Sequence, residues 1–425
     1  MEKTTSSKQY PEMGFTKKIF LALQHMIAMF GATVLVPLLT GFDVSTTLFC
    51  AGVGTLIFHL CTKKKVPVFL GSSFAFIPAI QTVYENYHSL SYAQGGIIVA
   101  GFLYVLMSLL INKIGVSKIT KYFPAQVIGP MIIVIGLNMI PTALNMASQN
   151  YIIAAITLIM AVLTSQKGHG FIKQLSIIIS VTIGYLISLK AGIVDLSPIT
   201  EASIVAIPKF SAPKFDIGAI LIIAPVILAV FMEHIGDITT NSAVVGEDFL
   251  KDPGLNRTLL GDGLATMVAG FLGGPANTTY GENTGILAIT KNYDPSILRI
   301  TAVLAIVLST VGKVGGFLQT IPQCVMGGIS LMLFSMIAIV GVKNIRSSHI
   351  DFNLKNIIVM VIIVVIGLGP NFGLNLQIRL TETASLSGLA LSAIVGVLLN
   401  VIFTTIEKRI NSWQDRMYRV YLYSI

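Results

Sequence analysis

Charged residues are scarce in this chain of 425 residues. Only 11% of the residues are Asp, Glu, Lys or Arg, whereas 54% are hydrophobic, and a soluble protein normally carries about 25% charged residues. Long apolar runs recur from Lys18 to Lys408 and leave no stretch for a soluble domain. The sequence therefore predicts an all-α protein that crosses a lipid bilayer many times, and it argues against a soluble enzyme.

Cysteine is also rare, and so are the patterns that accompany catalysis. Cys50, Cys61 and Cys324 have neither the spacing of a metal site nor that of a disulfide framework, so we interpret them as buried small hydrophobic residues. The sequence contains no metal-binding cluster, nucleophile–base pair or phosphate-binding loop. We therefore expect no enzymatic activity, no metal and no bound cofactor.

The apolar runs, divided at charges and turn residues, predict fourteen membrane-spanning segments. The first run, Ile19–Leu39, lacks a signal-peptide cleavage pattern and precedes many similar runs, so we expect it to be a retained helix. The approximate limits of the segments are 19–40, 45–60, 66–84, 92–111, 124–141, 150–165, 171–189, 217–240, 257–274, 275–290, 296–312, 322–342, 355–369 and 386–406.

The basic residues support this number of spans. A net charge of +9 could indicate a nucleic-acid partner in a soluble protein, but here the distribution of the charge is more informative. An even number of spans places both termini on one side, and all but five of the 28 Lys and Arg residues then fall on that side. The five exceptions are Lys190, Lys209, Lys214, Lys313 and Arg379. This asymmetry is typical of cytoplasmic loops, so we expect cytoplasmic termini, a location in the cytoplasmic membrane and no nucleic-acid partner.

The two halves of the chain resemble each other at an offset of about 200 residues. The matched segments are Asn112–Gly115 with Gly312–Gly315, Pro124–Pro130 with Pro322–Gly328, and Gln24-His25 with Glu233-His234. Seven predicted spans separate equivalent points, and because seven is odd the halves have opposite orientations. The pattern predicts two inverted repeats of seven spans, an arrangement of secondary transporters in which the substrate site lies at the midplane.

The third and tenth spans are interrupted. In the third, Val66–Leu70 is β-like, Gly71-Ser72-Ser73 follows, and a helix extends only from Phe74 to about Tyr84. In the tenth, Pro275–Gly281 is non-helical and a short helix runs from Glu282 to about Thr290. Opposite orientations bring both helix N-termini toward the midplane, where their free N–H groups can bind carbonyl oxygens or negative charge. The alternative is a pair of ordinary kinked helices.

Ionisable residues inside the spans are candidates for function because burying them in a bilayer is costly. Glu233 and Asp237 lie one turn apart on one face of the eighth span, and Glu282 begins the short helix of the tenth. His234 lies about 100° around the helix from Glu233 and can face elsewhere. His25 is either functional or bonded to nearby backbone.

A flat nucleobase such as uracil fits this set of groups. Carboxylates accept hydrogen bonds from ring N–H groups, and the backbone N–H groups of Phe74 and Gly281 can donate to the carbonyls. Phe74, Phe76 or Tyr280 can pack on the ring face. A proton bound to Asp237 or to a glutamate would couple transport to the proton gradient, because burial raises the pKa of a carboxyl group toward neutrality.

Several motifs resemble the nucleobase–ascorbate transporter family, also called nucleobase:cation symporter 2. Glu282-Asn283-Thr284-Gly285, followed after four residues by Thr290-Lys291, fits the signature of that family, and Gln24-His25 fits its Gln-His motif. Gly71–Pro78, Thr279–Asn283 and the stretch Leu23–Pro37 are similar to the uracil-carrying bacterial branch. The resemblance covers essentially the whole chain.

The resemblance implies proton-coupled uracil symport and a fourteen-span fold made of a core domain and a gate domain. The core domain would comprise residues 1–122 and 214–320, and the gate domain residues 123–213 and 321–425. The resemblance also implies a homodimer formed through the gate domains. Its only partners would then be the lipid bilayer, uracil and a second copy.

The resemblance also implies roles for individual residues. Glu233, Glu282, Phe74 and Gly281 match the ligand-binding positions of the family, and Tyr280 lies next to them. Asp237 departs from the family pattern, because a histidine is expected four residues after the glutamate of the eighth span. For proton coupling we consider Asp237, Glu233, His234 and His25, and the departure leaves open which of them binds the proton.

Three alternatives remain from the sequence. A xanthine or urate permease of the same family would share the signature but not the extended match at Gly71–Phe76. An anion transporter or channel of the same fold would tend to lack paired carboxylates, because these repel anions. A membrane enzyme would require a reactive cluster.

Overall fold

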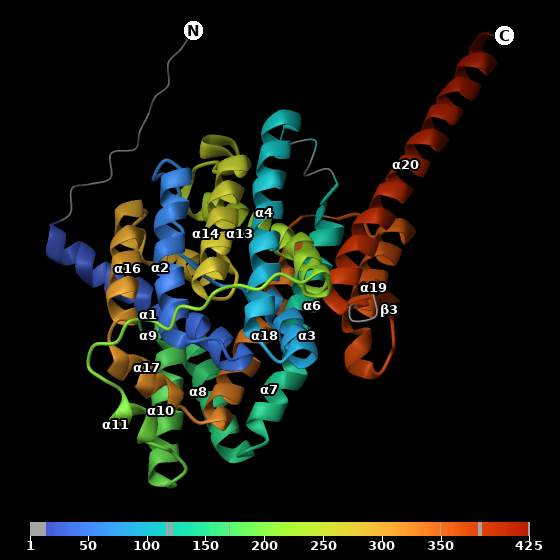
Figure 1. Cartoon of the computed structure of the whole chain (residues 1–425). Coiled ribbons are helices and arrows are strands. Elements are labelled where there is room, and N and C mark those ends of the chain that lie inside the picture. Colours follow the sequence, from blue (N-terminus) through green and yellow to red (C-terminus); the bar gives the residue numbers. More distant parts are fainter. Residues whose placement is uncertain are drawn as a thin grey trace.

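The computed structural model describes residues 14–115, 118, 122–169, 171–348, 350–380 and 385–423. Within them the chain is helical, apart from two small sheets of two strands each (Figure 1). The prediction of an all-α polytopic membrane protein is confirmed at this level. Seven described helices are long and apolar enough to cross a membrane, and three more are apolar but shorter: Tyr151–Lys167, Ser176–Lys190 and Pro295–Ser309.

The first half of the chain forms these elements: α1 (Phe15–Thr40), α2 (Val44–Cys61), β1 (Leu70–Ser72), η1 (Phe74–Phe76), α3 (Ile77–Tyr87), α4 (Leu90–Ile114), α6 (Ala125–Asn138), α7 (Ile140–Ala147), α8 (Tyr151–Lys167), α9 (Phe171–Gln174) and α10 (Ser176–Lys190). Then follow α11 (Ser197–Glu201), α12 (Ile217–Ile223), η2 (Ala224–Val226), α13 (Ile227–Val245), η3 (Leu250–Gly254) and α14 (Leu255–Leu272). The remaining elements are β2 (Asn277–Thr279), α15 (Gly281–Thr290), α16 (Pro295–Ser309), α17 (Gly312–Gln319), α18 (Gln323–Ser347), α19 (Leu354–Leu368), η4 (Gly369–Phe372), β3 (Gln377–Arg379), β4 (Ser385–Ser387) and α20 (Gly388–Tyr423).

Each predicted span overlaps a helix, or a strand that leads into a helix. The eighth span differs in detail, because Pro225 lacks a backbone N–H and the chain forms the 3-10 turn η2 between α12 and α13. The last span continues into a helix of 36 residues, about 54 Å long. Its C-terminal half projects beyond the rest of the molecule (Figure 1).

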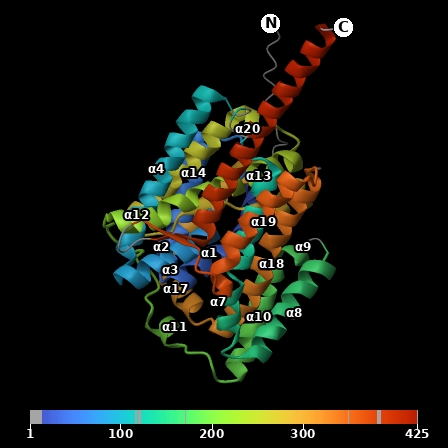
Figure 2. The same ribbon diagram turned by 90° about the vertical axis from the view of Figure 1, so that its right-hand side faces the viewer.

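The helices pack in two groups. One group joins α2, α4, α14 and α16, and the other joins α6, α7, α8, α10, α18 and α19. Figure 2 shows α4 and α14 on one side of the molecule and α8, α10, α18 and α19 on the other. In the first group, a Cβ atom on Gly101 of α4 or on Gly263 of α14 would lie 2.7–2.8 Å from the carbonyl oxygen of the opposite glycine. Only glycine allows these two backbones to approach so closely.

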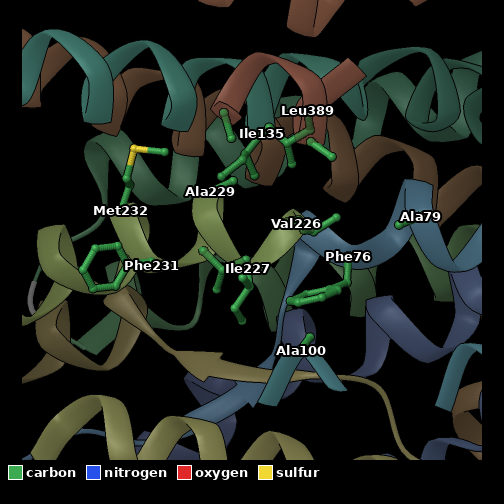
Figure 3. Packing of buried hydrophobic residues seen from close by; sticks show 14 of the residues in the cluster. Phe76, Ala79, Ala100, Ile135, Val226, Ile227, Ala229, Phe231, Met232 and Leu389 are labelled. Carbon is green, nitrogen blue, oxygen red and sulfur yellow. The ribbon is translucent and has the colours of Figure 1, made fainter. Parts of the chain in front are cut away.

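The seam between the groups is filled by apolar side chains. Ile135 of α6 and Leu389 of α20 pack in one cluster with Val226, the last residue of η2, and Ala229 in the first turn of α13 (Figure 3). A second cluster joins Phe74 and Tyr280 to residues of α18. The residues that flank the interrupted spans therefore contact both groups.

Candidate functional site

The interrupted spans cross through the pair of strands β1 and β2. The strands are antiparallel, and Gly71 is opposite Thr278. Further hydrogen bonds extend the pairing at both ends, from Ser73 N to Ala276 O (2.9 Å) and from Tyr280 N to Phe69 O (3.2 Å). Because the strands are antiparallel, η1 with α3 and α15 lead away from the crossing in opposite directions. Both predicted interruptions are confirmed, and the helix boundary in the tenth span is one residue earlier than predicted.

Buried side chains satisfy the extended backbone at the crossing. The Asn277 amide donates to Cys50 O (3.2 Å), and the Thr266 hydroxyl donates to Asn277 O (3.0 Å). The Thr55 hydroxyl accepts from Leu70 N (2.9 Å). Non-helical backbone at membrane depth requires such partners or a polar cavity. Helices α2 and α14 supply these partners and thus hold the strand pair.

Glu233 and Asp237 lie on α13 beside this crossing, and both are partly accessible. Asp237 Oδ2 accepts a hydrogen bond from the Thr279 hydroxyl (2.9 Å). A Cβ atom on Gly281 would lie 3.4 Å from Asp237 Oδ1. The Asp237 carboxylate is therefore located at the first residue of α15, where the helix dipole favours negative charge.

The side chain of Glu282 lies outside what the structure describes, although its backbone forms part of α15. The neighbouring Asn283 is buried, and its Oδ1 lies 3.2 Å from Nδ1 of buried His25 on α1. His25 thus contacts the side chain of another span rather than nearby backbone.

His234 points away from the crossing, toward α14. Its Nδ1 lies 3.1 Å from Asp262 Oδ2, and its Nε2 lies 3.0 Å from the Thr258 hydroxyl. The side chains of His234 and Asp262 are fully buried, and the ring of Tyr104 lies beside the imidazole at a centroid distance of 6.4 Å. The structure therefore brings His234 together with a carboxylate that the sequence analysis had not considered.

The aromatic candidates separate into different surroundings. Phe74 contacts Phe334 of α18 edge to face, with ring centroids 5.7 Å apart. The Tyr280 hydroxyl donates to Ser72 O (3.0 Å), and its ring lies directly over the backbone of Gly71. Phe76 instead points into the packing of α4 and α13 (Figure 3). Of the three predicted ring-packing residues, Phe74 and Tyr280 share one cluster and Phe76 lies in another.

The arrangement is suited to binding a small polar molecule. In the described part of the chain, no group of three His, Cys, Asp or Glu side chains could hold a metal ion. What converges on the crossing is a set of acceptors on α13 and backbone donors at the start of η1 and α15. Such a set can bind a small planar molecule that carries both N–H groups and carbonyls.

Comparisons with known proteins identify the family and the fold of the chain. Residues 16–376 match the Xan_ur_permease model, described as a permease family. The chain is 40% identical over 400 residues to the uracil permease of Bacillus caldolyticus, covering 90% of this chain and 91% of that protein. It is 39% identical over 399 residues to the uracil permease of Escherichia coli K12, covering 91% of both. The transmembrane domain of the cyanobacterial bicarbonate transporter BicA has a similar fold, with a TM-score of 0.62, 13% identity, and 92% and 99% of the two chains covered.

Proposed function

Because this chain belongs to the permease family, a family of membrane transporters, we propose that it carries uracil across the membrane together with protons. The relatives named uracil permease, which match over nine-tenths of the chain, support uracil as the substrate. The observation that carries the proposal is the position of Asp237 beside the start of α15, with Glu233 one turn away on the same helix. Uracil offers two N–H donors and two carbonyl acceptors, which match carboxylates and free helix N–H groups respectively.

We propose a role for each group at the crossing. Glu233 and Glu282 accept hydrogen bonds from the ring N–H groups. Glu233 belongs to the eighth span and Glu282 to the interrupted tenth span. The backbone N–H groups of Phe74 and Gly281 donate to the carbonyls, since the first N–H groups of a helix have no partner within it. Tyr280, held by Ser72, forms the wall next to them.

Asp237 is the proposed proton acceptor. It bonds the hydroxyl of Thr279 in β2, so a proton that neutralises it changes a direct contact between α13 and the crossing. Glu233, one turn away, is also proposed to take part in proton coupling. His25 and His234 are the other two proposed members. His25 contacts the buried side chain of Asn283, and His234 contacts that of Asp262.

For the whole molecule we propose fourteen spans in two inverted repeats, with the core and gate domains divided at residues 122, 213 and 320. The two groups of packed helices support this division. The protein is proposed to act in the cytoplasmic membrane with both termini in the cytoplasm, as a homodimer joined through the gate domains.

Competition of labelled uracil uptake by unlabelled bases tests the substrate. Uracil should compete, whereas xanthine, urate and uracil methylated on both ring nitrogens should not, because methyl groups would replace the donors that the carboxylates need. If xanthine or urate competes better than uracil, the chain is a purine permease of the same family.

An anion transporter is the second candidate, because the fold is shared with a bicarbonate transporter at 13% identity. That likeness extends to the fold alone. The carboxylates of Glu233 and Asp237 would repel an anion bound next to them. Strong competition by bicarbonate, with none by uracil, would favour this alternative.

A further inference from the structure

A third polar residue continues the functional face of α13. Asn241 follows Asp237 by four residues and Glu233 by eight, so all three share one side of the helix. Unlike the two carboxylates, Asn241 is fully buried. It carries no charge and therefore lacks the signal that marks ionisable residues in a membrane span.

The amide of Asn241 joins three elements. Its Nδ2 donates to the carbonyl oxygen of Pro67 (3.2 Å), in the extended residues that lead to β1, and to the hydroxyl of Thr284 on α15 (3.1 Å). A carbonyl can only accept, so the contact with Pro67 fixes which end of the amide is the donor. Thr284 is also buried. One side chain thus connects α13 to both interrupted spans.

Two hydrogen bonds link α13 to the tenth span: one reaches β2, the strand that leads into α15, and the other reaches Thr284 of α15 itself. The first link is the bond from Thr279 to Asp237, whose strength depends on the charge of the carboxylate. The second joins two neutral groups and does not depend on protonation. When Asp237 gains a proton, Asn241 still holds α15 next to α13.

We propose that Asn241, acting through Thr284 and Pro67, is a positioning residue that fixes the distance between the acceptors on α13 and the N-terminus of α15. The inference rests on the transport function proposed above. Asn241 then determines how tightly substrate is bound, and it leaves the rate of the transport cycle unchanged.

Asn241→Ala and Thr284→Val test the proposal through KM and maximal uptake rate for labelled uracil, together with the Kd of the purified protein. Loss of a buried neutral hydrogen bond should weaken binding about three- to tenfold in Thr284→Val. The effect should be larger in Asn241→Ala, because that variant also loses the hydrogen bond to the carbonyl oxygen of Pro67. The maximal rate should stay near that of the parent. Thr284→Ser keeps the hydroxyl and should restore the affinity. The double variant should bind no worse than Asn241→Ala, because both changes remove one shared bond.

Asn400→Ala is the matched control. Asn400 is buried and accepts a side-chain hydrogen bond from Gln126 (3.3 Å) in the other group of helices. Its replacement should lower thermal stability without changing KM. The proposal is overturned if Thr284→Ser is as weak as Thr284→Val, or if KM changes equally in Asn400→Ala. If the parent takes up a different base, uracil as the substrate is wrong, and the same ratios measured with that base still decide the role of Asn241.

Discussion

Glu233 and Asp237 are one turn apart on α13, but their surroundings differ. Asp237 accepts a hydrogen bond from the hydroxyl of Thr279 in β2 and lies next to Gly281, the first residue of α15, so part of its acceptor capacity is committed to the fold. Glu233 lies one turn further toward the N-terminus of α13. The proposal gives substrate binding to Glu233 and proton coupling to Asp237, and replacing each residue in turn tests this division.

Replacing Glu233 by Ala should weaken uracil binding. The change removes a charge-assisted hydrogen bond worth about 1.5–3 kcal/mol, which corresponds to a loss of about ten- to over a hundredfold in affinity. Titration calorimetry on the purified protein measures the Kd directly. Glu247→Gln, one residue beyond the C-cap Gly246 of α13, is the control and should bind as the parent does. Unchanged binding by Glu233→Ala would exclude it from the site.

Asp237→Asn should separate binding from coupling. The amide keeps the shape of the side chain and can still contact Thr279, so uracil should still bind. It cannot exchange a proton, so accumulation against a gradient should be lost, along with the rise in uptake as the external pH falls. Uptake into vesicles with and without a protonophore measures both. A variant that still accumulates uracil would show that the proton binds elsewhere.

Some of these residues were predictable from the sequence and others were not, for physical reasons. Glu233 and Asp237 were found because a carboxylate inside a span is costly. Asp262, in the ninth span, satisfies the same criterion and was not among the predicted residues. Asn241 and Thr284 carry no charge, so their sequence gives no comparable signal, and only the packing of α13 against α15 brings them together.

At the scale of elements, the breaks in the third and tenth spans were predictable, because proline removes a backbone hydrogen bond from a helix and glycine lowers its stability. The pairing of β1 with β2 across about 200 residues was not, since strands of three residues have almost no pattern of their own. The short helices α11 and α17 and the hairpin of β3 and β4 were missed for the same reason.

Gly71 is the position where the crossing has least room. A Cβ atom there would overlap the ring of Tyr280, so Gly71→Ala should displace β1 or Tyr280 and abolish uracil uptake. Uptake and surface expression should be measured together. Gly236→Ala is the control, because a Cβ at Gly236 meets its nearest neighbour, Ile132, at an ordinary 3.8 Å. Normal uptake by Gly71→Ala would mean that the crossing is not part of the site.

At the scale of the whole molecule, ion pairs and a long connection mark the two ends. Lys65, in the loop after α2, pairs with Asp252 of η3 (2.5 Å), and Lys18 of α1 pairs with Asp294, which precedes α16 (2.8 Å). Burial raises the pKa of the Asp294 carboxyl, but hydrogen bonds from Lys18 and Ser296 outweigh it and hold the pKa below its ordinary value. The Asp294 carboxylate therefore remains charged at neutral pH.

The segment of residues 191–216 lies at the opposite end. It bonds the beginning of α4, where Lys214 N donates to Ser91 O (2.8 Å), and the end of α16, where Ala206 N donates to Thr310 O (2.9 Å). Helix α16 begins just after Asp294, so its length separates this segment from the ion pairs. Four of the five exceptional basic residues lie in or next to this segment or on α17, which contacts it through Lys313 and Ile199.

This separation gives a test of orientation. In a background without the native cysteines, Lys64→Cys and Lys209→Cys place single thiols at exposed positions on the two ends. A membrane-impermeant maleimide added to intact cells should label Lys209→Cys and reach Lys64→Cys only after the membrane is permeabilised, because basic loops are retained in the cytoplasm. Uracil uptake by both variants confirms that they are inserted and folded. Labelling of Lys64→Cys from outside would reverse the orientation, and labelling of both from outside would contradict the fourteen-span arrangement, since an odd number of spans separates the two positions.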